Sequence, residues 1–206
     1  MGGIENRWCQ GIALCVCVAL LTSCAPRAIR GGAGTENPNL DVPAMSTTLD
    51  KKDIDYLVSE TLDPLLSSRF WASEVRTASP PPLFAIWPIQ NNTSYHIDDQ
   101  LLTLLSSIET TLVNSGDARV VNRQRQSELV AEIGLQQSAP FDPRTARRVG
   151  RQMGAQYFVT GKITSVEEKI QSTRRVQYSL FIQVIEIETG LIKFQNEAAR
   201  SKALKG

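Results

Sequence analysis

The chain has 206 residues, of which 22 are basic and 21 acidic, so its formal net charge is +1. This near-zero balance gives no electrostatic reason to expect a polyanionic partner such as nucleic acid. The length fits one domain of about 150 residues plus a tail. No internal repeat indicates a solenoid or a propeller.

The first segment has the pattern of a secretion signal. An apolar run at 11–21 follows Arg7 and fits a signal-peptide core of roughly 7–15 residues, whereas a membrane span needs about 20. The run ends in Leu-Thr-Ser-Cys at 21–24, which resembles the bacterial lipobox, where the cysteine receives a diacylglyceryl group and becomes the first mature residue. We therefore predict a signal peptide at 1–23 and lipidation of Cys24. An ordinary signal peptide or a buried N-terminal helix are the alternatives.

Cysteine usage favours the lipid-anchored interpretation. All four cysteines of the chain lie at or before Cys24, at positions 9, 15, 17 and 24. A lone thiol without a pairing partner is unusual in a secreted protein, whereas an acylated cysteine is expected there. The sequence after Cys24 therefore offers no disulfide, no cysteine metal site and no thiol nucleophile.

Residues 24–49 read as a flexible tether. They carry Gly, Pro, Asn and Thr, contain no aromatic residue and have only scattered apolar ones, so they cannot bury enough surface to become ordered. Fully extended, 25 residues reach about 80 Å at about 3.3 Å each. Their root-mean-square span is nearer 28 Å, from about 5–6 Å times the square root of the residue number.

Residues 50–206 alternate between helical and extended patterns. A helix is predicted from Asp50, with a kink or restart at Pro64 capped by Asp63. A buried strand follows at 83–89, and then a polar loop at 90–98. The apolar stripe of the first helix contains Ile54, Leu57, Val58, Leu62, Leu65 and Leu66.

The second half continues with a helix over 98–115, a short strand at 118–121, and helices over about 123–134 and 143–154. Three strands at about 157–163, 176–184 and 191–194 then form a meander, and every second residue of the middle strand is apolar and expected to face inward: Val176, Tyr178, Leu180, Ile182 and Val184. The order α-β-α-β-α-α-β-β-β predicts an α/β (α+β) fold, with one mixed sheet of four to five strands flanked by helices. The early β-α-β unit is expected to be a right-handed parallel crossover.

Few side chains suggest chemistry. His96 is the only histidine, and although Asp98 and Asp99 lie nearby, a loop contact explains it better than a metal or a general base. Without a second histidine, a later cysteine or a nucleotide-binding glycine loop, we predict no enzyme, no metal and no cofactor. The polar residues Asn91, Asn92, Thr93 and Ser94 either bond their own turn or face a partner, and both interpretations stay open.

Four arginines form the clearest charged pattern. Arg144, Arg147, Arg148 and Arg151 fall in one narrow sector of the predicted helix, opposite Val149 and its apolar neighbours. We call these four residues the Arg stripe. It is either a solvated face or a cationic surface for anionic carboxylates or an acidic protein patch, with Arg147 and Arg151 as the candidate contacts.

Four segments together resemble the LpoB family, which comprises outer-membrane lipoproteins that activate bifunctional penicillin-binding proteins. They are Pro-Ile-Gln-Asn-Asn-Thr-Ser-Tyr-His-Ile-Asp at 88–98, Leu-Val-Asn-Ser-Gly at 112–116, Gly-Ala-Gln-Tyr-Phe-Val-Thr-Gly at 154–161 and Val-Ile-Glu-Ile-Glu-Thr-Gly at 184–190. The resemblance implies a sheet flanked by helices, similar to the N-terminal domain of TolB. Enterobacterial members carry a longer, Pro-rich tether, from which this chain departs.

The resemblance implies a non-enzymatic periplasmic lipoprotein, held in the outer membrane by acyl chains on Cys24, that docks on a peptidoglycan synthase. Residues Asn91–Ser94 and His96 would then face the partner. One rival is an envelope assembly or secretion lipoprotein related to the curli-export pore subunit, which needs lipid-facing strands of about 9–11 alternating residues. Another is a structural lipoprotein that binds peptidoglycan itself.

Overall fold

The computed structural model describes residues 28–205 except 125, 127 and 129–142. The chain divides into two compact units between Asp41 and Val42. The predicted signal peptide and Cys24 lie outside the described residues. In the described part, no helix combines the length and the apolar character that a membrane crossing requires.

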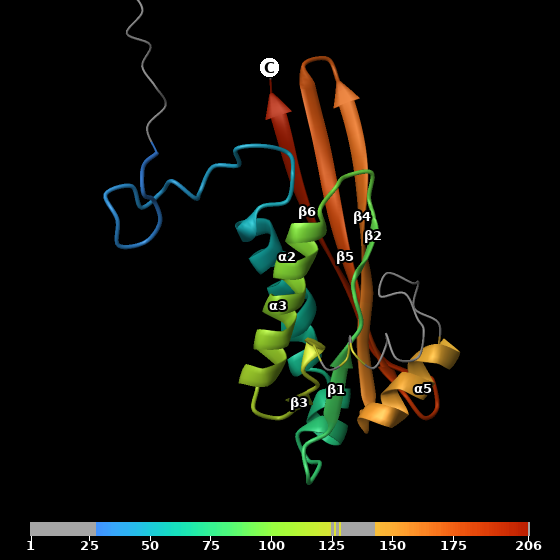
Figure 1. Ribbon diagram of the computed structural model, residues 1–206. Helices are drawn as coiled ribbons and strands as arrows, with labels where there is room; N and C mark the ends of the chain where they lie inside the picture. Colours follow the sequence, from blue (N-terminus) through green and yellow to red (C-terminus); the bar gives the residue numbers. More distant parts are fainter. Residues whose placement is uncertain (1–27, 125, 127, 129–142, 206) are drawn as a thin grey trace, which may run out of the picture. The chain divides into compact units, whose positions relative to one another are not determined.

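Figure 1 shows the elements of the second unit. They are α2 (Lys51–Leu66), the π-helical turn η1 (Trp71–Val75), β1 (Leu83–Ile86), β2 (Gln90–Asn92), α3 (Asp98–Asn114), β3 (Arg119–Val120), α5 (Pro143–Met153), β4 (Tyr157–Ile170), β5 (Thr173–Glu186) and β6 (Ile192–Lys205). The predicted order of helices and strands is confirmed, except that the helix expected at 123–134 lies largely outside the described residues.

The first helix begins at a capping box. Asp50 accepts a hydrogen bond from the backbone N–H of Asp53, and the Asp53 carboxylate accepts one from the N–H of Asp50. Two N–H groups that a helix start leaves without a partner are thereby satisfied. Just upstream, Thr47 and Leu49 are already buried, so the packed domain includes residues that the sequence pattern assigns to the tether.

Pro64 does not break this helix, contrary to expectation, and Asp63 is not a new start. A proline lacks the N–H that would bond the carbonyl four residues earlier, here that of Glu60. The side chain of Asn196 on β6 donates to that carbonyl at 2.9 Å. A contact from a distant strand therefore replaces the missing helical bond, and α2 runs unbroken to Leu66.

The described strands form one mixed, six-stranded sheet in the order β3-β1-β4-β5-β6, with β2 also paired to β4. Strands β1, β2 and β3 pair in parallel with their neighbours, and β4, β5 and β6 are antiparallel. The sheet has one strand more than the upper bound expected, because β2 lies within the segment assigned to a loop. The meander strands are also longer than predicted, at 14 residues each.

Pro88 separates β1 from β2. Ile86 lies opposite Val159 on β4, whereas Gln90 lies opposite Lys162, so this side has one residue more than β4. Proline has no N–H to donate to a sheet ladder, and a bulge, in which one strand has an extra residue, accommodates it here. The chain therefore rejoins β4 and carries the polar segment along it.

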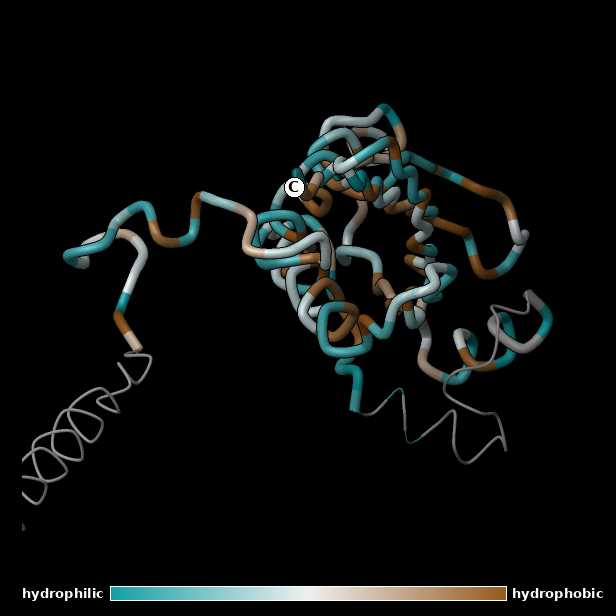
Figure 2. Tube along the Cα trace, turned by 90° about the horizontal axis from the view of Figure 1, so that it is seen from above, coloured by the Kyte–Doolittle hydropathy of each residue, from teal (hydrophilic) through white to brown (hydrophobic). Residues whose placement is uncertain are grey.

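The main core lies between the sheet and the helices α2 and α3. The alternating β5 residues predicted to face inward are all fully buried there, and the apolar stripe of α3 is buried as well. Figure 2 shows brown (hydrophobic) and teal (hydrophilic) stretches interspersed along the chain. The β5 set consists of Val176, Tyr178, Leu180, Ile182 and Val184, and the α3 set of Leu101, Leu104, Leu105, Ile108 and Leu112.

Helix α5 covers one end of the opposite sheet face. Val149 is fully buried and shares a small second apolar cluster with Phe158 and Ile187. Gly150 lets the helix approach closely, because a Cβ there would lie 2.6 Å from the Ile187 side chain. Gly154, with φ +69°, ends the helix as predicted.

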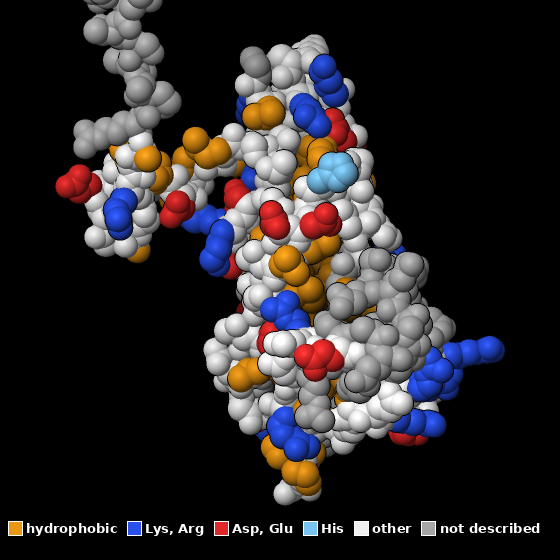
Figure 3. Space-filling view, viewed as in Figure 1, with side chains coloured by type: hydrophobic (Ala, Val, Ile, Leu, Met, Phe, Trp, Pro, Cys, Tyr) orange, Lys and Arg blue, Asp and Glu red, His pale blue; other side chains and the backbone are white. Residues whose placement is uncertain are grey.

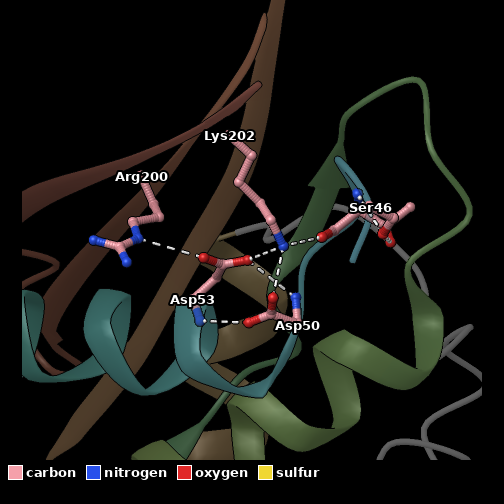
Figure 4. Close-up of polar contacts among 6 residues, drawn as sticks. Ser46, Asp50, Asp53, Arg200 and Lys202 are labelled. Atoms are coloured by element: carbon pink, nitrogen blue, oxygen red, sulfur yellow. Dashed lines mark hydrogen bonds and ion pairs between the residues drawn. The ribbon is translucent and has the colours of Figure 1, made fainter. Parts of the chain in front are cut away.

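A buried charge cluster joins β6 to the start of α2 (Figure 4). The Lys202 ammonium donates to the carboxylates of Asp50 and Asp53 at 2.7 Å each and to the carbonyl of Thr48 at 2.8 Å. Arg200 reaches the other oxygen of Asp53 at 3.4 Å. Lys202 and Asp53 are both about 95% buried, so neither charge has water as an alternative partner.

Candidate partner-binding surface

The segment after β2 is shaped by its own side chains. The Asn91 carboxamide oxygen accepts from the N–H of Thr93 at 3.0 Å and from its hydroxyl at 2.7 Å. The Asn91 amide donates to the Tyr95 carbonyl at 2.9 Å, and the Tyr95 N–H donates to the Thr93 hydroxyl at 3.1 Å. Asn91 and Thr93 therefore perform the turn chemistry that the sequence left as one alternative.

Three other side chains of this loop point to solvent. Asn92, Ser94 and His96 are exposed, and within the described part of the chain none of them has a hydrogen bond or ion pair. The histidine (pale blue) is visible on the face shown in Figure 3. The loop thus separates into residues that set its shape and residues that are available to a partner. We call Asn92, Ser94 and His96 the loop triad.

Tyr95 anchors this loop to the β4–β5 hairpin. Its hydroxyl donates to the Glu167 carboxylate at 2.5 Å and accepts from Arg174 at 3.1 Å. Arg174 also forms a two-pronged ion pair with Glu167, and its hydrogen bonds lower the pKa of Glu167 to about 2. The Tyr95 ring packs against Tyr178 with centroids 5.9 Å apart. The loop triad is therefore held by a rigid scaffold, where binding residues are commonly found.

Sequence reasoning did not find this anchor. Glu167 and Arg174 are seven positions apart and meet Tyr95 only because the hairpin folds back and lies beside β2. An acidic and a basic residue flanking a Gln-Ser turn were the only local signal, and such pairs are common on exposed hairpins.

The Arg stripe lies on α5, as predicted. Arg144, Arg148 and Arg151 are exposed and Arg147 is half-buried. Together with Gln152 the stripe lines a hollow of about 520 Å³. Arg151 also pairs with Glu188 in the turn after β5, with N–O distances of 3.1 and 3.2 Å. The hollow therefore has a cationic wall, in which the charge of Arg151 is partly neutralised by Glu188.

The structure does not bring the loop triad and the Arg stripe together. Asn92 lies opposite Thr164 of β4, whereas α5 packs over Phe158 of the same strand. Six residues of strand separate these levels, about 20 Å at 3.3 Å per residue. A partner that buries about 800 Å² of one protein can span such a distance, so one partner can contact both.

The two surfaces present polar and cationic side chains. Within the described ranges, no group of three or more His, Cys, Asp or Glu side chains is placed to hold a metal ion. His96 is exposed and has no acidic hydrogen-bond partner there. What the surfaces present are an amide, a hydroxyl, an imidazole and guanidinium groups, which suit hydrogen bonds and ion pairs with a protein.

Comparison with known proteins identifies the family. A family model described as peptidoglycan-synthase activator LpoB matches residues 53–199, more than half of the chain. The chain belongs to the LpoB family. The match takes in the LpoB-like segments quoted from the sequence, the loop triad and the Arg stripe. The resemblance that these segments suggested is thereby confirmed.

Solved LpoB domains have the same fold. The LpoB C-terminal domain from Escherichia coli superposes with a TM-score of 0.53 at 18% identity, covering 70% of this chain and 98% of that domain. The one from Salmonella enterica gives 0.51 at 19% identity, covering 69% and 97%. No curated protein sequence matches the chain. At such low identity the LpoB structures establish the fold, and the residues of the surface must be argued from this chain.

Proposed function

We propose that this chain is a non-enzymatic lipoprotein that docks on a bifunctional penicillin-binding protein and activates its peptidoglycan synthesis. The observation that carries the proposal is the family match over residues 53–199, which spans nearly the whole packed domain. The surfaces support it, because they offer hydrogen-bonding and cationic groups on a rigid scaffold. A docking protein acts by differential contact with two states of its partner, which requires no catalytic group of its own.

The anchor is proposed from the sequence. Acyl chains on Cys24 would hold the protein in the outer membrane, facing the periplasm, since each buried methylene contributes about 0.8 kcal/mol and two or three chains suffice for durable binding. Ala25 after the cysteine is consistent with outer-membrane sorting. The carboxylates of peptidoglycan itself are the alternative contact of the Arg stripe.

The first test is activation in a reconstituted reaction. We expect the acylated chain to raise the rate of glycan polymerisation by the purified synthase of the same organism. Replacing Asn92 and His96 with alanine should raise the dissociation rate roughly tenfold, because interface side chains that matter cost more than about 1 kcal/mol on truncation. Stopped-flow or surface-based kinetics measure this rate.

The matched control for the loop is Thr103→Ala with Thr110→Ala on the exposed side of α3. Both hydroxyls bond only their own helix, to carbonyls four residues earlier. The control pair should leave binding and activation unchanged. If the Asn92 and His96 variant dissociates no faster than this control, the loop is not the contact, and the family role must rest on another surface.

The Arg stripe should act mainly on the association rate. Exposed charges are screened within about 10 Å at 0.1 M salt, so they steer an encounter more than they hold a complex. We expect Arg147→Glu with Arg148→Glu to slow association at low salt, and this effect should disappear at high salt. Arg30→Glu with Arg69→Glu is a control with the same net-charge change. Equal slowing in both pairs would show that only total charge matters.

Lipidation is tested at Cys24 directly. The Cys24→Ser chain should remain an unprocessed precursor that incorporates no labelled palmitate and does not support activation in cells. The parent and Cys24→Ser chains are compared by radiolabelling and by the mobility of the precursor. Normal processing and labelling of the variant would contradict the lipobox interpretation, without affecting binding by the domain.

A further inference from the structure

The end of the sheet farthest from α5 carries an unusual combination of side chains. This end contains the β4–β5 turn and the end of β6, which Figure 1 shows together at the top of the unit. Ile170 lies opposite Thr173, and Thr173 lies opposite Lys205. We call this end, from Val166 to Ile170 with its partners on β5 and β6, the sheet tip.

The sheet tip exposes aliphatic side chains. Ile170 is 72% exposed, Val166 61% and Leu204 46%. Val166 and Ile170 are four positions apart and lie on one face of the sheet, whereas Leu204 lies on the other. Apolar side chains therefore protrude on both faces of a narrow edge. This shape suits insertion into a deformable lipid layer better than docking on a flat protein surface.

The same end is cationic. Arg174 and Arg175 are neutralised by ion pairs with Glu167 and Glu168. Lys169 and Lys205 make no ion pair or hydrogen bond through their side chains within the described part of the chain. The four basic residues of this edge, Lys169, Arg174, Arg175 and Lys205, outnumber the two acidic ones, Glu167 and Glu168, and Lys169 interacts with Glu167 only through its charge, without an ion pair. Basic and apolar side chains occur together at the upper end of Figure 3.

The opposite end of the β5–β6 hairpin also exposes aliphatic groups. Leu191 and Ile192 are 60% and 52% exposed. Their neighbours in the turn, Glu186 and Glu188, are acidic, but Glu188 is paired with Arg151 of the Arg stripe, which lies at the same end. Charge therefore does not separate the two ends, and the point at which the tether enters the domain decides between them.

The tether reaches the domain at the sheet tip and not at the α5 end. Lys202, three residues before Lys205, binds the Thr48 carbonyl at 2.8 Å and so holds the incoming chain beside the end of β6. Met45, three residues upstream of Thr48, is exposed as well. From Cys24 to the start of the packed unit at Val42 the root-mean-square span is only about 23 Å. The 14-residue strand β5 is about twice as long, roughly 46 Å.

From this geometry we propose that the sheet tip lies on the phospholipid surface. Ile170 then sits at the boundary between the headgroups and the acyl chains, and Lys169 and Lys205 contact anionic phosphates. The proposal rests on acylation of Cys24, which is part of the proposed function. A short tether that enters at the cationic, apolar end keeps this end nearest the membrane. The Arg stripe then points away from the membrane, toward a partner that projects from the other side of the periplasm.

Fluorescence quenching tests this contact in the acylated chain. The mature sequence has no cysteine besides Cys24, so Ser172→Cys in the turn and Leu191→Cys at the opposite end each accept one dye. The chains are reconstituted in vesicles of phosphatidylethanolamine and phosphatidylglycerol that contain brominated acyl chains. We expect the dye at 172 to be quenched several-fold more than the dye at 191. Omitting phosphatidylglycerol or changing Lys169 and Lys205 to glutamine should reduce the difference.

The outcomes separate this inference from the proposed function. If the chain floats with the vesicles but the dye at 172 is quenched no more than the dye at 191, the tip contact is wrong and the anchor stands. If lipid has no effect at 172 but the synthase protects the dye there, the tip belongs to the protein partner. A chain that does not float at all lacks the anchor, and both this inference and the anchored function are then overturned.

Discussion

Lys202→Met should lower the free energy of unfolding by about 3–5 kcal/mol, because it leaves a buried carboxylate without its partner. Asp53 is 3% exposed, and the Lys202 ammonium is its close partner at 2.7 Å, while Arg200 lies farther away at 3.4 Å. Lys205→Met, three residues along the same strand but exposed, is the matched control and should change stability little. Urea unfolding of both chains measures the difference.

The same cluster predicts a pH range of stability. Burial acts to raise the pKa of Asp50, but its hydrogen bonds with Lys202 and with backbone N–H groups outweigh this and lower the pKa. Its contribution is therefore present above the unfolded value of about 3.9 and is lost as pH falls through the folded value. Burial acts to lower the pKa of Lys202, but hydrogen bonds to Asp50 and Asp53 outweigh it and raise the pKa. That contribution is present below about pH 10.4 and is lost as pH rises through the folded pKa.

The Lys202→Met chain should lose the alkaline dependence of this cluster and part of the acid dependence, because backbone N–H groups still bond the Asp50 carboxylate. Adding Asp53→Asn to it should recover part of the lost stability, since the unpaired buried charge is then removed. If Lys202→Met is as stable as Lys205→Met, the cluster does not hold β6 to the start of α2. The position of the tether relative to the sheet tip would then also lose its support.

Gly161→Ala should destabilise the sheet by about 3 kcal/mol or somewhat more, at the upper end of the overpacking range. A Cβ at Gly161 would lie 2.2 Å from the backbone carbonyl oxygen of Phe181 on the paired strand β5. A backbone atom cannot rotate away as a side chain can, so β4 and β5 must separate in the middle of their ladder. The glycine is thus required by close approach of two strands.

Ser165→Ala, on the same face of β4 four residues further along, is the control for this substitution and should cost little. Thermal and denaturant unfolding compare the two chains. Equal stability of Gly161→Ala and Ser165→Ala would show that the strands have room that the structure does not indicate. Because the loop triad is carried by β2 alongside β4, Gly161→Ala should also weaken partner binding where Ser165→Ala does not.

Most of the fold could be predicted because its signals are periodic. The apolar residues of α2 recur about every 3.6 residues and those of β5 every two, so each pattern marks the buried face of its element. Both faces were predicted correctly. Pro64 was misinterpreted because the group that replaces its hydrogen bond, Asn196, lies 132 positions away in the chain (196 − 64). The short strand β2 was missed because its three polar residues have no strand pattern of their own.

The candidate binding surface, too, could be predicted from the sequence only in part. The sequence identified the polar loop and the Arg stripe as candidates, since exposed polar residues in a turn and arginines on one helical face are local patterns. It could not separate Asn91 and Thr93, which bond their own turn, from Asn92 and His96, which are open to solvent. That distinction depends on the exact turn geometry. It also could not show that the loop and the stripe lie about 20 Å apart along β4.

Thus the sequence by itself determined the family, the order of elements, the faces that are buried and the predicted anchor at Cys24. Each of these depends on residues that lie close together in the chain. The tertiary structure alone decided which end of the domain the tether enters. Lys202, Asp53 and Thr48 meet there across about 150 positions, since 202 − 53 is 149 and 202 − 48 is 154. No local pattern can report a contact of that separation, because it is formed only when β6 packs beside α2.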